Sequence, residues 1–199
     1  MLAALIFAAL LTNTYFEEIT HDWINLTGFA ARDLFYWQLW RFFTMAVVTT
    51  GGHVFWEALL FVATFVGTAE WLAGSRRVAL TFWGIHVFSL VLLSFIITVS
   101  IHQLRSFGFE ASQVARDVGP SAGYFACLGL VSATLKRPWH WISGAGIWIM
   151  LIVMLFLPVP AGESAALKFS ADLVHLLAFP LGWLSYRIGK KGMVPPKRT

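Results

Sequence analysis

The sequence predicts an all-α, polytopic membrane protein with six transmembrane helices. Of its 199 residues, 58% are hydrophobic and only 12% are charged, and the mean hydropathy is +0.73. Soluble domains carry about 25% charged residues, so this chain lacks the charge to cover a water-exposed surface. The apolar residues also gather in six runs separated by polar stretches. These observations exclude a disordered chain, a nucleic-acid-binding protein and an ordinary soluble enzyme.

Each of the six runs approaches the length that a membrane-spanning helix requires. About 20 mainly apolar residues cross the hydrocarbon core as a helix. The first run starts at Met1 without the basic stretch or cleavage site of a signal peptide, so we interpret it as a short first helix. The expected spans are residues 1–15, 52–74, 78–100, 119–135, 139–157 and 170–186. Together they form one membrane domain, residues 1–189, followed by a basic tail, residues 190–199.

The distribution of Lys and Arg predicts the orientation in the membrane, since cytoplasmic loops are enriched in these cations. Nine of them lie at one set of helix ends: Arg76, Arg77, Lys136, Arg137, Arg187, Lys190, Lys191, Lys197 and Arg198. The opposite loops hold five, Arg32, Arg41, Arg105, Arg116 and Lys168. We therefore expect both termini in the cytoplasm. For the membrane itself we expect a bacterial inner (plasma) membrane, which the charge distribution does not by itself indicate. Residues 16–51, 101–118 and 158–169 would face outward.

Two polar residues inside the apolar runs lie at similar depth. Ser121 is about 22 Å from Lys136 along its helix, and His175 is about 18 Å from Arg187, at ~1.5 Å per residue. In a core ~30 Å thick, both would lie about 8–12 Å below the outer surface. A serine hydroxyl beside a histidine suggests a nucleophile and its base. Depth alone favours a structural role for both residues, because serine and histidine in membrane helices usually bond their own backbone or a neighbouring helix.

The remaining candidates receive structural interpretations. The lone Cys127 lies in an apolar run, so we expect a small packing residue and neither a disulfide nor a metal site. No organic cofactor is implied. Asp172 is expected to cap the start of the sixth span, and Glu70 to bond a neighbouring loop. The aromatic stretch from Leu34 to Phe43 fits a helix lying in the headgroup region, or an ordinary aromatic belt.

Several of these features together resemble the rhomboid family of intramembrane serine proteases. In that family the catalytic serine starts the fourth span, and the catalytic histidine lies in the sixth. The matching residues around the serine are Gly119, Ser121, Phe125 and Gly129, and those around the histidine are His175, Ala178 and Gly182. A Trp40-Arg41 pair before the second span and a Gly67, Glu70, Gly74 pattern at its end also match. The resemblance covers about residues 37–186.

The resemblance implies a serine endopeptidase that cuts transmembrane segments of membrane proteins near their outer end. Ser121 and His175 would form the catalytic dyad, and Phe125 would pack against the imidazole. The backbone N–H of Ser121 and the side chain of His53 would bind the oxyanion. Gly123, Ala126, Gly129, Ala178 and Gly182 would let the fourth and sixth spans approach closely.

Three departures from the family pattern leave a second interpretation open. Ala122 follows the serine where the family has glycine, Ala178 replaces another glycine, and Glu57 stands at the place of an asparagine that donates to the oxyanion. An ionised Glu57 would repel a developing oxyanion unless it were protonated, turned away or paired with His53. The alternative is a catalytically inactive rhomboid-like protein that binds membrane helices. A transporter is a third interpretation, although the sequence lacks visible inverted repeats.

Overall fold

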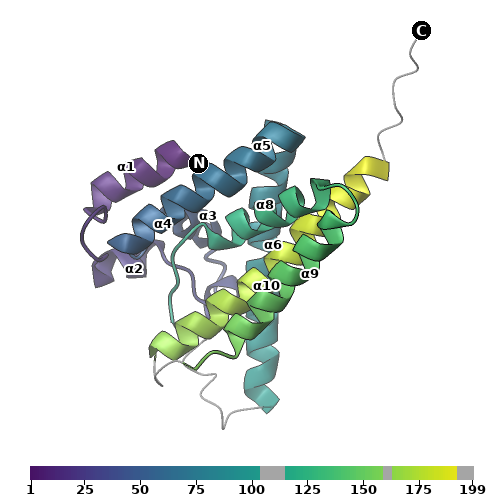
Figure 1. Cartoon of the computed structure of the whole chain (residues 1–199). Helices are drawn as coiled ribbons and strands as arrows, with labels where there is room; N and C mark the ends of the chain where they lie inside the picture. Colours follow the sequence, from purple (N-terminus) through teal and green to yellow (C-terminus); the bar gives the residue numbers. More distant parts are fainter. Residues whose placement is uncertain (104–114, 159–162, 192–199) are drawn as a thin grey trace.

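The computed structural model describes residues 1–103, 115–158 and 163–191, and this part of the chain is helical. Two isolated bridges, Glu18 with Gly51 and Phe29 with Asp117, are its extended pairings. The helices follow one another as α1 (Leu2–Thr12), α2 (His21–Thr27), α3 (Arg41–Thr44), α4 (His53–Phe61), α5 (Gly67–Ala73), α6 (Ser75–Gln103), α8 (Ser121–Thr134), α9 (Trp139–Leu155) and α10 (Glu163–Lys191) (Figure 1). The predicted all-α class is confirmed. The tail beyond residue 191 and most of the predicted outer loop 101–118 lie outside the described residues.

Four helical stretches of the described chain are long and apolar enough to cross a membrane, as expected for an integral membrane protein. They are His53–Ala73, Ser75–Thr98, Trp139–Phe156 and Ala165–Ile188. In the first of these, a π-helical turn, Val62–Val66, joins α4 to α5. The expected spans 52–74, 78–100 and 139–157 agree closely with these stretches.

The prediction of six spans, the first of them short, is not reproduced among the described residues, where four helices are long enough to cross a membrane. α1 has 11 residues and α8 has 14, and both are apolar but shorter than the others. At ~1.5 Å per residue, α8 is about 21 Å long, less than a hydrocarbon core of ~30 Å. α1 ends early because Asn13 adopts a left-handed conformation, and Gly119 and Pro120 delay the start of α8 to Ser121.

The sixth predicted span begins earlier than expected, which corrects the role of Asp172. α10 starts at Glu163 rather than near Ser170, so Asp172 lies in the third turn and cannot cap the helix. Its carboxylate instead pairs with Lys168, one turn before it. Lys168 Nζ also donates to the carbonyl of Met154 at 2.6 Å, which ties this part of α10 to the end of α9.

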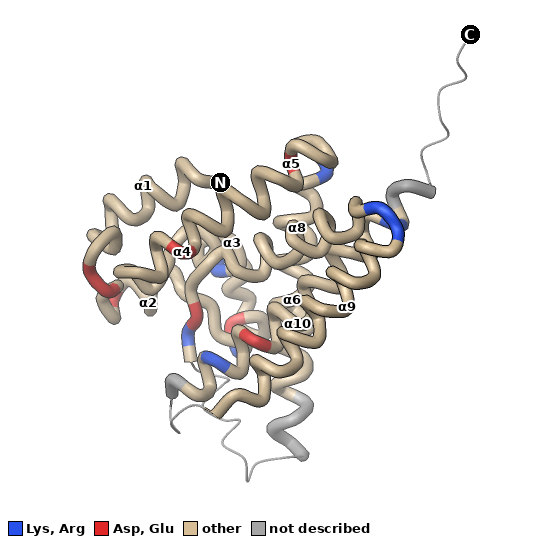
Figure 2. The backbone as a smooth tube through the Cα atoms, in the orientation of Figure 1, with Lys and Arg blue, Asp and Glu red and all other residues tan. Residues whose placement is uncertain are grey.

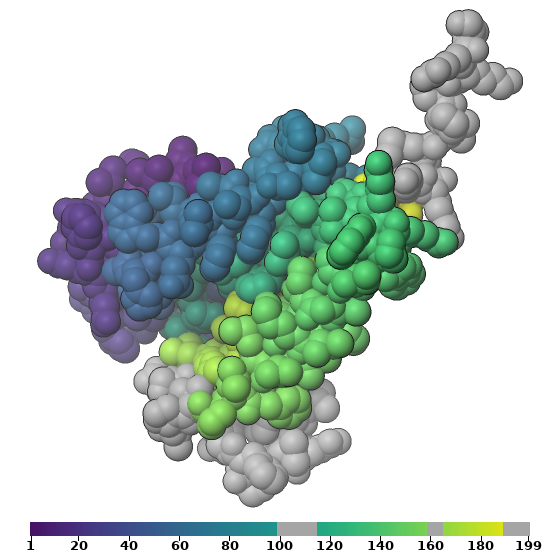
Figure 3. Space-filling model, viewed as in Figure 1, coloured from purple at the N-terminus to yellow at the C-terminus, as the bar shows by residue number. Residues whose placement is uncertain are grey.

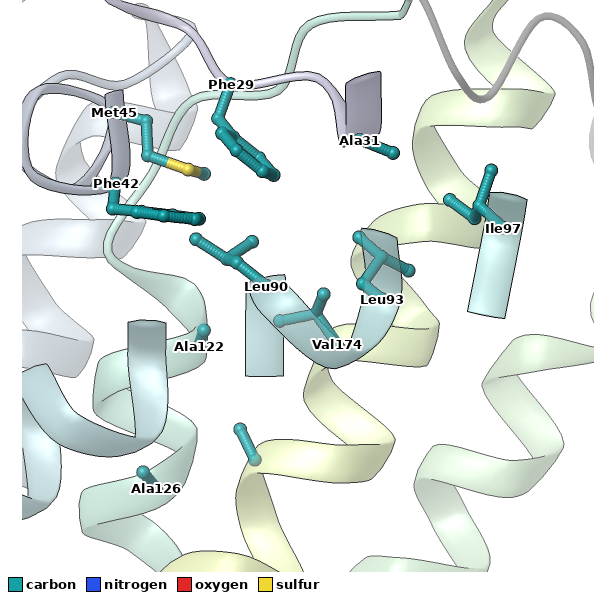
Figure 4. Close-up of a cluster of buried hydrophobic side chains, with 11 residues drawn as sticks. Phe29, Ala31, Phe42, Met45, Leu90, Leu93, Ile97, Ala122, Ala126 and Val174 are labelled. Atoms are coloured by element: carbon teal, nitrogen blue, oxygen red, sulfur yellow. The ribbon is translucent and has the colours of Figure 1, made fainter. Parts of the chain in front are cut away.

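α8 is the central helix of the bundle. It packs against α10, α6, α9 and α5, and nine of its 14 residues are buried. The largest buried cluster joins α6, α8 and α10 to the connection between α2 and α4 (Figure 4). From that connection Phe29, Phe42 and Met45 enter the cluster, where they meet Leu90 and Val174. The connection is therefore part of the core of the bundle.

The aromatic stretch within this connection does not form the expected headgroup helix. The stretch contains the end of a short 3-10 turn, Ala31–Leu34, and most of α3, separated by a left-handed Trp37 (φ 59°). Tyr36, Trp37 and Trp40 are exposed, so the stretch still presents the aromatic surface of an interfacial belt.

The cation-rich helix ends meet at one end of the molecule. Arg77, at the start of α6, donates to the carbonyls of Ser185 and Tyr186 near the end of α10, at 3.0 and 2.8 Å. Figure 2 shows a second positive segment at the turn between α8 and α9, where Lys136 and Arg137 lie. The clustering agrees with the grouping of these cations in the sequence.

A proline shapes α10 one turn after His175. Pro180 has no N–H, so it cannot donate to the carbonyl of Leu176, four residues earlier. The indole N–H of Trp148 on α9 donates to that carbonyl at 3.2 Å. A side chain of the neighbouring helix thus satisfies a backbone group that would otherwise lose its partner in an apolar setting.

Candidate active site

The first helical turn of α8 positions Ser121. Gly119 adopts φ 142°, a conformation that strongly favours glycine, and its N–H donates to the carbonyl of Met45 at 2.8 Å. Pro120 follows as the residue that caps the helix, and its carbonyl accepts the N–H of Tyr124 at 3.1 Å. Ser121 is therefore the first helical residue, where backbone N–H groups have no partner within the helix. This end of a helix also carries partial positive charge.

Glycines bring α8 against α10. A Cβ on Gly129 would lie 2.0 Å from the carbonyl oxygen of Phe179, and one on Gly182 would lie 1.9 Å from that of Ala126. The backbones of the two helices are thus in direct contact, as the small-residue spacing predicts. Gly123 has a different role from the one expected, because its Cβ would meet the ring of Phe82 on α6 at 2.5 Å. It allows α8 to approach α6 and not α10.

Ser121 and His175 line one cavity of about 180 Å³ between α4, α8, α10 and the connection before α4. Figure 3 shows the molecular surface dipping between α4 and the green and yellow helices α9 and α10. Within the described residues, Nε2 of His175 is buried without a hydrogen-bond partner, so Ser121 and His175 share the cavity but are not hydrogen-bonded to each other in this structure. A second, smaller cavity of about 20 Å³ adjoins Ser121 and also contacts Asp117 and Ser170. It has room for about one water molecule.

Phe125 lies against the imidazole of His175, as the sequence predicts. Their ring centroids are 4.4 Å apart, with an angle of 31° between the planes. Phe125 is one turn after Ser121 on α8, so the helix that carries the hydroxyl also restricts the histidine ring. His86, the other histidine at depth, is engaged elsewhere, because its Nε2 lies 2.9 Å from the carbonyl oxygen of Phe42 and donates to it.

Of the two residues of α4 that were predicted to lie at the site, His53 and Glu57, only Glu57 lines the cavity. Glu57 lines the cavity together with Val54 and Ala58. His53, one turn earlier, is exposed at the first residue of α4 and is not part of the cavity lining. Its predicted role as an oxyanion donor therefore has no geometric support. The unpaired N–H groups at the start of α8 are better placed for that role.

Two cavity residues were missed by the sequence analysis, Asp117 and Thr49. The backbone of Asp117 pairs with Phe29 at 2.9 and 3.0 Å, and its carboxylate accepts the N–H of Val118 at 2.8 Å. Burial raises the pKa of Asp117 to about 6. Thr49 is 3% exposed, and its hydroxyl has no partner among the described residues. The position of Asp117, four residues before Ser121, is the only feature of the sequence that could have indicated that it lies near the site.

A buried ionic cluster anchors the segment that precedes Ser121. We call Asp33, Arg41 and Arg116 the loop clamp. Arg116 donates to both carboxylate oxygens of Asp33, at 2.5 and 3.1 Å, and Arg41 lies 3.7 Å from the same carboxylate. Arg41 also donates to the carbonyls of Asn25 and Gly28 at 2.8 and 2.7 Å. The Trp-Arg pair noted in the sequence thus supplies one of the two cations of the loop clamp.

Comparison of the chain with models of protein families, with curated proteins and with solved structures found no match.

Proposed function

We propose that this protein is an intramembrane serine endopeptidase of the rhomboid kind, which cuts the transmembrane segments of other membrane proteins near the outer face. The observation that carries the proposal is the shared cavity of Ser121 and His175. One residue begins the central helix, the other carries a buried imidazole nitrogen without a partner, and Phe125 packs on that ring. A serine and an oriented imidazole in one cavity are the groups that acyl transfer needs, and their hydrogen bond would form when the substrate binds.

The short α8 supports the proposed position of the reaction. In a six-helix arrangement, α1 and α8 would be the two short members, and α8 would be enclosed by longer helices. Its first residue would then lie below the outer surface, while its other end would lie near the cationic cytoplasmic ends. A cavity open above Ser121 would admit water for hydrolysis. A protein that cuts inside lipid needs this access, because water is the second substrate.

The mechanism begins with attack of Ser121 Oγ on the carbonyl carbon of the scissile peptide bond. His175 accepts the serine proton, and the carboxylates of Glu57 and Asp117 in the same cavity favour the imidazolium that forms. The N–H groups at the start of α8 stabilise the oxyanion. The C–N bond then breaks, the amine leaves with the proton from His175, and an acyl ester remains on Ser121. Water, deprotonated by His175, attacks the ester carbonyl, the bond to Ser121 Oγ breaks, and His175 returns the proton to that oxygen as the new carboxylic acid leaves.

A fluorophosphonate probe tests the proposal, because it labels only an activated serine. We expect Ser121→Ala to abolish labelling of the detergent-solubilised protein and His175→Ala to slow it at least about a thousandfold. Ser132→Ala is the matched control, since Ser132 lies on the same helix but is hydrogen-bonded to Ser143. It should label like the wild type. Cleavage of transmembrane reporter segments in vesicles would then extend the test to peptide bonds.

The alternative function is binding of membrane helices without cleavage. Glu57 favours it, because a carboxylate that lines the cavity opposes an oxyanion and is not paired with His53. That alternative predicts equal labelling of the wild type, Ser121→Ala and His175→Ala. Equal labelling would therefore overturn the protease proposal and leave the binding protein.

A further inference from the structure

Four acidic residues of the described chain show two different environments. Asp33 is paired with Arg41 and Arg116, and Asp172 is paired with Lys168. Glu57 and Asp117 line the cavity of Ser121 and have no ion-pair partner within the described residues. The cations that could have reached them are committed elsewhere, since Arg116, the neighbour of Asp117, bonds to Asp33.

Two carboxyl groups without ion-pair partners leave the site short of positive charge. Asp117 is half-buried in the cavity lining, whereas Glu57 lines the cavity with an exposed side chain. Burying a charge without a partner is unfavourable, and proteins normally supply a counter-charge. The lining of this cavity includes two carboxyl groups and no Lys or Arg. Its electrostatic potential is therefore negative, and low-dielectric walls strengthen the attraction of a cation at this distance from water.

A second observation indicates that the cavity receives a ligand. Thr49 lines the same cavity and is only 3% exposed, and its buried hydroxyl has no partner among the described residues. Such a buried oxygen is normally satisfied, and it could accept from an ammonium or guanidinium group. The volume of about 180 Å³ holds one long side chain rather than a whole peptide segment.

We propose that this cavity holds the side chain that precedes the scissile bond, and that it selects lysine or arginine there. The proposal rests on the proposed function, since Ser121 attacks the carbonyl of that same residue. Glu57 and Asp117 supply the negative charge, and Thr49 supplies a neutral acceptor. The substrates are thus membrane proteins with a cation near the outer end of a transmembrane helix. Such positions are uncommon, because the positive-inside rule depletes them, and this gives selectivity.

Three matched peptide probes test the selection with the full chain in detergent. Acetyl-Ala-Ala-Xaa diphenyl phosphonates differ only in Xaa, which is lysine, alanine or glutamate. Ser121 Oγ forms a bond to phosphorus, one P–O bond to phenoxide breaks, and phenol leaves with the serine proton carried by His175. The rate of adduct formation is followed by intact-protein mass spectrometry. We expect the lysine probe to react about tenfold or more faster than the alanine probe, and the glutamate probe to be slowest.

Variants of the carboxylates identify the source of the preference. Because each variant is judged by its own ratio of lysine to alanine rates, a general loss of activity does not affect the readout. Glu57→Gln and Asp117→Asn should each bring the ratio toward one, and Glu57→Lys should make the glutamate probe faster than the lysine probe. Glu70→Gln is the control, because Glu70 lies on the same span outside the cavity and bonds to Ser75. It should keep the wild-type ratio.

The outcomes separate this inference from the proposed function. If fluorophosphonate labels Ser121 but the lysine and alanine probes react equally, or alanine reacts faster, the selection is wrong and the protease remains. A preference that persists in Glu57→Gln and Asp117→Asn alike also overturns it. If no probe labels Ser121 in the wild type, the proposed function fails and the inference fails with it.

Discussion

The loop clamp and the cavity of Ser121 are neighbouring polar regions that differ in how their buried groups are satisfied. They meet between Arg116, which belongs to the loop clamp, and Asp117, which lines the cavity. In the loop clamp, the 1% exposed carboxylate of Asp33 accepts from Arg116 and from the N–H of Ala30 at 2.9 Å. In the cavity, the described residues leave the hydroxyl of Thr49 and Nε2 of His175 without partners.

The difference separates polar groups that hold the fold from those available to a ligand. Burying a polar group is unfavourable unless it is hydrogen-bonded, so a structural group is expected to have its partners in the folded chain. The loop clamp meets that expectation. The cavity does not, although the same backbone runs through both regions. The unsatisfied groups of the cavity would gain hydrogen-bond partners when a ligand or water enters it. A binding site needs polar groups that are free in this way.

Breaking the loop clamp should produce the largest effect on stability. Asp33→Ala leaves Arg41 and Arg116 buried without their common counter-charge, which should destabilise the protein by about 3–5 kcal/mol. Thermal unfolding of the purified protein in detergent measures the loss. Fluorophosphonate labelling should also fall, since the segment leading to Ser121 loses its anchor. Asp22→Ala, at an exposed carboxylate of α2, is the control and should melt like the wild type. Equal melting of both variants would show that the loop clamp contributes nothing.

The sequence predicted the parts of this arrangement that depend on helical periodicity. Ser121, Phe125 and Gly129 lie on one helix at spacings of about one and two turns, and depth along the span matched Ser121 with His175. These relations follow from 3.6 residues per turn and a fixed rise, so a linear sequence contains them. The close approach of α8 and α10 followed from the same spacing of small residues.

The parts that depend on contacts between loops could not be predicted. Arg116 and Asp33 are 83 residues apart, and neither belongs to a periodic pattern. Thr49 and Asp117 enter the cavity because the connection before α4 folds over the start of α8. His53 and Glu57 show that spacing within one helix is not sufficient. Residues four apart were expected to lie together at the site, but only Glu57 lines the cavity. Helix ends set by Asn13 and Gly119 likewise made the first span, already expected to be short, and the fourth span shorter than predicted.

Replacing Asp117 with a neutral residue should stabilise the protein, whereas replacing Asp33 should destabilise it. The pKa of Asp117 in the folded state, about 6, lies above its ordinary value of 3.8. The folded protein therefore binds the proton more readily than the unfolded chain, and stability falls as the pH rises from about 4 through 6. Asp117→Asn removes this penalty and keeps an oxygen for the Val118 N–H. It should be more stable than the wild type at pH 7.5 by at most about 3 kcal/mol.

The advantage of Asp117→Asn should disappear at pH 4, where the wild-type carboxyl is already protonated. Parallel thermal unfolding of both proteins at pH 4, 6 and 7.5 follows the difference. A wild type that is more stable than Asp117→Asn at pH 7.5 would mean that the carboxylate has a stabilising partner, and the proposed contrast with Asp33 would be wrong.

Two threonines five residues apart give the smallest and most specific comparison. Thr44, beside the loop clamp, donates to the carbonyl of Thr27 at 2.8 Å, whereas the hydroxyl of Thr49 has no partner among the described residues. Replacing each by valine removes only the hydroxyl. Thr44→Val should lose about 1 kcal/mol of stability, because the carbonyl of Thr27 is left without its donor. Thr49→Val should lose no stability and should gain up to about 1 kcal/mol, because it removes a buried hydroxyl that has no partner among the described residues.

The same two variants should have the opposite order of effect on labelling of Ser121, with Thr49→Val affected and Thr44→Val unaffected. Thr49→Val removes an acceptor from the cavity, so labelling of Ser121 by the lysine phosphonate should slow. Thr44→Val should label at the wild-type rate while folded, because its hydroxyl is bonded away from the cavity. Loss of stability without loss of labelling in one variant, and the reverse in the other, would assign Thr44 to the fold and Thr49 to the site. Two variants that change both properties together would show that the loop clamp and the cavity act as one unit.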